Sequence, residues 1–314
     1  MNAHGELRRV RGQGLRDFMA DLLKRQPSAE GGVGLEFDVR GTVLKDSSKS
    51  SLKAQGYIAF PRDVLALHEA RLNADVELVD FPATLVKELL GARAPIKSAT
   101  GHFAQRVHVE GNPAEQLHLR GDLEFKQVSV DAPEVFLAPL VGSDGRVIFE
   151  LHWSRQSVHV RRADFRVNDI KFSLQGEVDA WDSKDPRFRL NLSGMSAAVS
   201  AVRKYLPLKF FESPRLEKII NDIQAGQIDI KKAGIDATLA QLRGLSQGEV
   251  GKQIWFEAEL RDMAGTLPAE GTLPLRGVQG RVSLANGVFA FQDFRGSYGD
   301  SRFTEANGTS VMST

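Results

Sequence analysis

Apolar and polar residues alternate strictly in this chain, and the pattern recurs from near residue 33 to near residue 303. Val33, Leu35, Phe37 and Val39 take every second place, with charged residues such as Glu36 between them. Successive side chains of a β-strand point to opposite faces, so each such segment has one apolar and one polar face. The pattern predicts a mainly β fold: a long, curved antiparallel sheet with one continuous apolar face.

Turn residues divide this pattern into strands and a few short helices. The clearest turn is Asn286-Gly287, a pair preferred where a tight hairpin needs positive φ at both central positions. Apolar residues at three- and four-residue spacing predict the helices. The expected strands are 33–44, 51–60, 74–79, 102–130 (broken at 111–113), 145–153, 157–167, 170–180, 187–193 and several within 227–303. The expected helices are 15–25, 82–91, 196–206 and 214–225, and 61–72 is expected to be a helix or a helix followed by a strand.

The order of these segments predicts the domain organisation. Residues 1–29 are expected to form an N-terminal helical lead-in, and residues 304–314 a polar, disordered tail. Between them, meanders end in short helices several times, with little sequence identity between the copies. We expect three loose units, about 30–95, 96–212 and 213–303, that together form an open β-groove of repeated meanders.

Composition excludes several functional classes. The chain has 41 basic and 40 acidic residues and no basic stripe with interleaved aromatics, which gives a nucleic-acid partner little support. It has no cysteine, so disulfides, thiolate metal ligands and thiol catalysis are ruled out. No apolar run approaches the roughly 18 residues of a membrane helix.

Motifs for chemistry are also missing from the sequence. It contains no G-x-S-x-G elbow, no H-E-x-x-H and no pair of carboxylates that could be nominated for acid–base work. We therefore expect a protein that is not an enzyme and has no cofactor. The seven histidines are expected to be solvated outer-face residues with no metal site, because His118 and His152 occupy polar positions of their strands.

The last block of the chain carries a family resemblance. Residues 277–303 resemble the strand–turn–strand signature of AsmA-like proteins (the AsmA, YhdP and TamB type), and residues 174–192 and 76–82 resemble the family more loosely. In that family a "G-x-x-G-x-V-x-L-x-x-G" segment precedes an apolar pair and then "L-x-G-x-x-G-D-S". The matching residues here are Gly277, Gly280, Val282, Leu284 and Gly287, then Phe294, Gly296, Gly299, Asp300 and Ser301.

The resemblance implies a function as well as a fold. AsmA-like proteins are attached to the bacterial inner membrane by an N-terminal helix and extend through the periplasm as a β-groove that handles phospholipid. The expected partners are therefore phospholipid acyl chains and membrane-associated proteins at the inner and outer membranes, and the expected location is the periplasm. This chain lacks the anchoring helix, so it is interpreted as an internal or C-terminal part of a longer protein.

Two arrangements of the apolar face remain open at this point. In an open groove the face is covered by lipid, whereas in a structural or adhesive β-sandwich two sheets close on each other and show the same alternation. The residues expected to line an open groove are Leu35, Phe37, Val39, Leu119, Leu123, Phe125, Phe149, Leu151, Trp153, Phe256 and Phe291.

Overall fold

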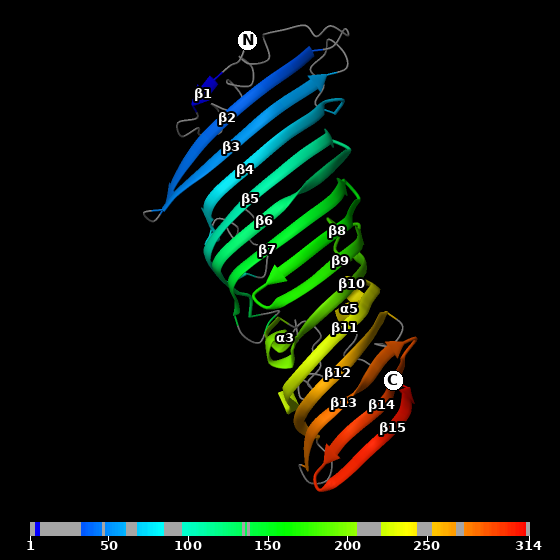
Figure 1. Ribbon diagram of the computed structural model, residues 1–314. Helices are drawn as coiled ribbons and strands as arrows, with labels where there is room; N and C mark the ends of the chain where they lie inside the picture. The colour runs from blue at the N-terminus through cyan, green and yellow to red at the C-terminus, as the bar shows by residue number, and fades with distance from the viewer. Residues whose placement is uncertain are drawn as a thin grey trace.

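The computed structural model describes residues 4–6, 33–45, 48–60, 68–84, 96–133, 136, 139–205, 221–243, 253–267 and 273–311. These residues form one sheet of fifteen strands, in which each strand pairs with its neighbours in sequence (Figure 1). The strands in the first part are β1 (His4–Glu6), β2 (Val33–Lys45), β3 (Ser48–Phe60), β4 (Arg71–Pro82), β5 (Ser98–Asn112), β6 (Gln116–Asp131), β7 (Leu140–Ser154) and β8 (Ser157–Val167). The remaining strands are β9 (Ile170–Asp179), β10 (Arg187–Ala198), β11 (Ile223–Thr238), β12 (Ile254–Leu267), β13 (Leu273–Ala285), β14 (Val288–Tyr298) and β15 (Ser301–Val311).

The sheet is open and almost entirely antiparallel. Every pairing from β2 to β15 is antiparallel, while the short β1 runs parallel to β2. The order β1 to β15 leaves both outer strands with one partner each, so the sheet does not close into a barrel. The expected fold class is confirmed. A sandwich of two packed sheets is wrong for the described part of the chain, because all of its strands belong to one layer.

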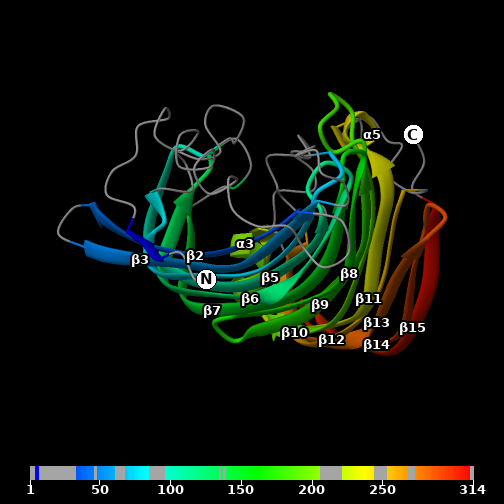
Figure 2. The same cartoon turned by 90° about the horizontal axis from the view of Figure 1, so that it is seen from above.

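The strands bend along their length, so the sheet is U-shaped when seen from its end (Figure 2). Register shifts interrupt the pairing in several strands, for instance beside Asp80 in β4, Gln127 in β6 and Asp293 in β14. These three residues have φ between 51° and 56°. A bulge with such a residue inserts one extra position, bends its strand and increases the local twist. Bulges in several strands therefore contribute to the curvature.

The described helices are short and lie on the concave side. They are α3 (Val199–Tyr205) and α5 (Leu239–Arg243), and α3 sits within the bend in Figure 2. Val199 packs with Met263 of β12 and Val278 of β13, and Leu242 of α5 packs on Ala237. The helix expected at 196–206 is present at 199–205, while residues 196–198 end β10. Those at 15–25, 82–91 and 61–72 fall wholly or largely outside the described residues.

Three other expectations need correction. Residues 304–311 are not disordered but complete β15, because their backbone pairs with β14. Residues 223–225, expected to end a helix, begin β11; residues 214–220 lie outside the described part. Within the helical lead-in expected at 1–29, residues 4–6 form a strand. An edge strand with a solvated face needs no apolar alternation, which is why the polar segment 304–311 was misjudged.

Candidate functional site

Strand register places all eleven expected groove residues on one face of the sheet. Residues directly opposite each other in adjacent strands point to the same side, and Phe37 connects in this way through Gly56, Ala74 and Val109 to Leu119. The same step-by-step pairing links Val39 of β2 to Phe149 of β7 and on to Phe256 of β12. We call this the inner face, because it is the face on which α3 and α5 pack. It is concave in Figure 2.

The large side chains of the inner face are only partly buried. Of the eleven residues, Leu35 is buried and the other ten are half-buried. Apart from Pro82, the buried apolar residues from β4 through β8 are all alanines, such as Ala74 and Ala163. A face closed against a second protein layer would bury its leucines and phenylalanines first, since they remove the most apolar area from water. The large apolar side chains of the inner face over β4–β8 therefore keep part of their surface accessible, whereas Leu35 of β2 and Phe60 of β3 are buried.

The second half of the inner face is better covered. Hydrophobic clusters there join α3 and α5 to residues of β9–β15, including Ile170, Met195 and Val278. The half-buried Phe256 and Phe291 belong to this half, and their rings contact Phe289 and Phe294 at centroid distances of 6.4 and 5.4 Å. The uncovered apolar surface therefore lies mainly over β4–β8.

Two of the expected groove residues also have a structural role. A Cβ added at Gly145 would overlap the ring of Phe125, and one added at Gly308 would press on the ring of Phe291. Each ring therefore lies over a glycine of the neighbouring strand. Such packing supports a strand at a position with no side chain of its own. Phe125 and Phe291 contribute to strand pairing as well as to the apolar surface.

The opposite, outer face carries many charged side chains, and acidic and basic residues on neighbouring strands pair with each other. Cross-strand ion pairs run over it, such as Arg106–Glu77 at 2.9 Å, Lys232–Glu257 at 3.0 Å and Arg146–Asp122 at 3.3 Å. The nearly equal numbers of acidic and basic residues are consistent with this pairing. Exposed pairs of this kind contribute only about 0–1 kcal/mol each. Their main effect is to make one face of the sheet polar while the other stays apolar.

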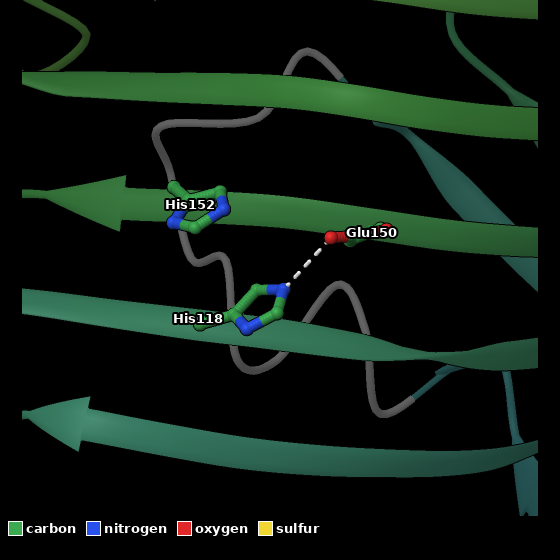
Figure 3. Close-up of side chains that lie close together, drawn as sticks. All are labelled: His118, Glu150 and His152. Atoms are coloured by element: carbon green, nitrogen blue, oxygen red, sulfur yellow. Dashed lines mark hydrogen bonds and ion pairs between the residues drawn. The ribbon is translucent and has the colours of Figure 1, made fainter.

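The outer face also holds a group that sequence reasoning missed. His118 of β6 lies directly opposite His152 of β7, and Glu150 precedes His152 by two residues on the same side (Figure 3). The Nε2 of His118 is 3.1 Å from Oε1 of Glu150, and the two imidazole rings stack with centroids 4.4 Å apart. These histidines are outer-face residues, as expected, but they are not isolated. The β6–β7 connection is too long for its register to be predicted from a turn.

The ionisation of His152 is expected to make the stability of the protein depend on pH. Burial lowers its pKa from 6.5, and the positive charges of His118, Arg161 and His159 lower it further, while Glu150 acts in the opposite direction. The unfolded chain therefore takes up this proton first as pH falls through about 6.5, and the free energy of unfolding decreases down to the folded pKa. We expect the loss of stability between pH 7.5 and 5.5 in urea unfolding to be smaller in His152→Asn. An equal loss in both proteins would contradict this.

No helix in the described part of the chain has both the length and the hydrophobicity to cross a membrane. No protein-family model, curated protein or solved structure matches this chain.

Proposed function

We propose that this chain is a non-enzymatic lipid-handling protein that holds phospholipid acyl chains against the inner face of its sheet. The observation that carries the proposal is the half-buried state of the large apolar residues over β4–β8, on a curved single layer. Apolar surface of this extent is costly in water, and an exposed apolar patch of such size is typical of a binding surface. On the outer face, exposed apolar residues such as Tyr57 and Ile148 are scattered among charged and polar ones, and ion pairs cover much of the surface.

The dimensions of the sheet suit acyl chains. Fifteen strands spaced about 4.8 Å apart extend roughly 70 Å, and an acyl chain spans about half of a bilayer's hydrocarbon core, about 15 Å. Several chains therefore fit along the sheet. Burying about fourteen methylenes at ~0.8 kcal/mol each stabilises a bound chain by roughly 11 kcal/mol relative to water.

The same chain gains little relative to a bilayer, because a bilayer interior is already apolar. This balance allows lipid to enter and leave the sheet without being trapped. In this proposal lipids move passively along the inner face, and their polar headgroups stay at the rims of the curved sheet, in water.

The resemblance of residues 277–303 to AsmA-like proteins extends the proposal to the bacterial envelope. On that basis the chain works in the periplasm and supports phospholipid transfer between the inner and outer membranes. Its partners are then phospholipids and proteins at the two membranes.

Lipid analysis of the purified protein tests this proposal. We expect the full chain, produced in a Gram-negative bacterium with a periplasmic signal and purified without detergent, to retain phospholipid at near-stoichiometric amounts. The lipid is extracted and quantified by mass spectrometry against the protein concentration. A folded, monodisperse preparation free of phospholipid would contradict the proposal.

A further inference from the structure

We propose that His118, Glu150 and His152 form a binding site for a divalent transition metal ion such as Zn²⁺ on the outer face of the sheet. The site is separate from the proposed lipid-binding face, because its residues alternate along β6 and β7 with the apolar residues of the inner face. The metal site and the lipid-binding face can therefore be tested independently of each other.

The position of the three side chains is set by the backbone. His118 and His152 are cross-strand partners in the middle of a fifteen-stranded sheet, and Glu150 is paired with Arg120, the next outer-face residue of β6 after His118. All three side chains point to the same side of β6 and β7 in Figure 3. Metal sites depend on ligands held in place by rigid elements, and two adjacent inner strands meet that requirement.

The distances between potential ligand atoms suit one small ion. One ligand atom from each residue can be chosen so that all three lie within 4.8 Å of one another. Zinc binds imidazole nitrogen and carboxylate oxygen at about 2.0–2.2 Å, so two ligand atoms of a tetrahedral site are roughly 3.3 Å apart. The 3.1 Å separation between Nε2 of His118 and Oε1 of Glu150 is close to this value. The His152 ring, which stacks on His118, has to rotate for its nitrogen to point at the same ion.

The three residues form a ligand set that favours a metal ion of intermediate softness, such as Zn²⁺. Two imidazoles and one carboxylate are a ligand set suited to Zn²⁺, and three protein ligands leave one position for water. Metal ions bind the neutral form of histidine.

The positive charge of Arg161 lies beside the proposed site and provides a second test of it. Its guanidinium donates to Oε1 of Glu150 at 3.1 Å, and strand register places Arg120 and Arg162 on either side of Glu150. Arg161 and His118 contact the same oxygen, Oε1, so an ion would either displace Arg161 from Oε1 or bind through the second oxygen of the carboxylate. The positive charge of Arg161 nevertheless weakens binding of a dication. Removing this charge is expected to strengthen metal binding, whereas removing a ligand weakens it.

Calorimetric titration with ZnCl₂ tests the proposal, on the full chain without an affinity tag and after treatment with a chelator. We expect saturable binding near one ion per chain. The affinity falls by about tenfold or more in His118→Asn, His152→Asn and Glu150→Gln, and rises in Arg161→Gln. Co²⁺ absorption bands in the visible range, lost in the same ligand variants, give a second readout that reports coordination directly.

A matched control is present on the same face. Nδ1 of His108 is 2.9 Å from Oδ1 of Asp75, which is a histidine–carboxylate pair without the stacked second imidazole. His108→Asn should leave Zn²⁺ affinity unchanged. Absence of saturable binding to the wild type, or equal affinities in the wild type and His118→Asn, would overturn the proposal. Since the ligand side chains are only half-buried, their variants are expected to stay folded, which circular dichroism verifies.

Discussion

Replacing three large apolar residues of the inner face by asparagine is expected to reduce copurified phospholipid several-fold. Leu119, Leu123 and Phe149 lie close together on β6 and β7, in the half of the sheet that the described helices leave uncovered. Asparagine replaces apolar contacts with a side chain that binds water, so an acyl chain loses much of its favourable transfer free energy there. Lipid per protein is measured by mass spectrometry on detergent-free preparations.

The outer face provides a control with the same number and kind of changes. Tyr57, Val79 and Ile148 are apolar or aromatic residues of that face with exposed fractions of 42–48%. Their replacement by asparagine removes apolar surface that is exposed to solvent and should leave the lipid content unchanged. A similar loss of lipid in both triple variants would show that lipid binding does not depend on the inner face.

This experiment also separates an open face from a closed core. Asparagine at three fully buried positions would unfold the protein, because each buried amide would lack partners. The three inner-face positions are half-buried, so we expect a loss of stability of only about 1 kcal/mol for each change. Complete unfolding of the inner-face variant would contradict the account.

Gly176→Ala is expected to lower the free energy of unfolding by about 3 kcal/mol or more. Gly176 in β9 has φ of +143°, a conformation that residues with a Cβ rarely adopt, and an added Cβ would overlap the backbone oxygen of Arg189 in β10. Backbone strain and a clash with backbone atoms cannot both be relieved without disturbing the β9–β10 pairing. Urea unfolding measures the change.

Gly34→Ala is the corresponding control. A Cβ at Gly34 in β2 meets no atom within 4 Å, and its φ is outside the strained range. This change should alter stability by no more than about 0.5 kcal/mol. If Gly176→Ala were as mild as Gly34→Ala, the close approach of β9 and β10 at that point would be wrong.

Much of the fold follows from local sequence signals. The alternation at 33–44 corresponds to β2, because a strand with one apolar and one polar face must repeat with a period of two. The Asn286-Gly287 turn also forms as expected, with φ of 50° and 76° at its two central residues, and it pairs Ala285 with Val288. These features depend only on residues that are neighbours in sequence.

Features that depend on distant residues could not be predicted in this way. The bulge between Ser193 and Ser196 changes the β9–β10 register, and although it contains Gly194 at φ of +69°, a glycine alone does not fix how the register shifts. His118 and His152 become neighbours through pairing across the long β6–β7 connection, so only their polar positions were visible in the sequence. The sequence also does not distinguish an open sheet from a closed sandwich, because both have the same alternation of apolar and polar residues.

Photo-crosslinking along β7 tests the central claim most directly. A benzophenone amino acid is placed at each position from 146 to 151, one at a time, in the full chain expressed in bacteria with labelled phospholipid. We expect crosslinks to phospholipid at Val147, Phe149 and Leu151, whose side chains lie on the inner face, and none at the outer-face positions 146, 148 and 150. Equal crosslinking at all six positions, or none at any of them, would contradict the claim that hydrocarbon chains cover the inner face.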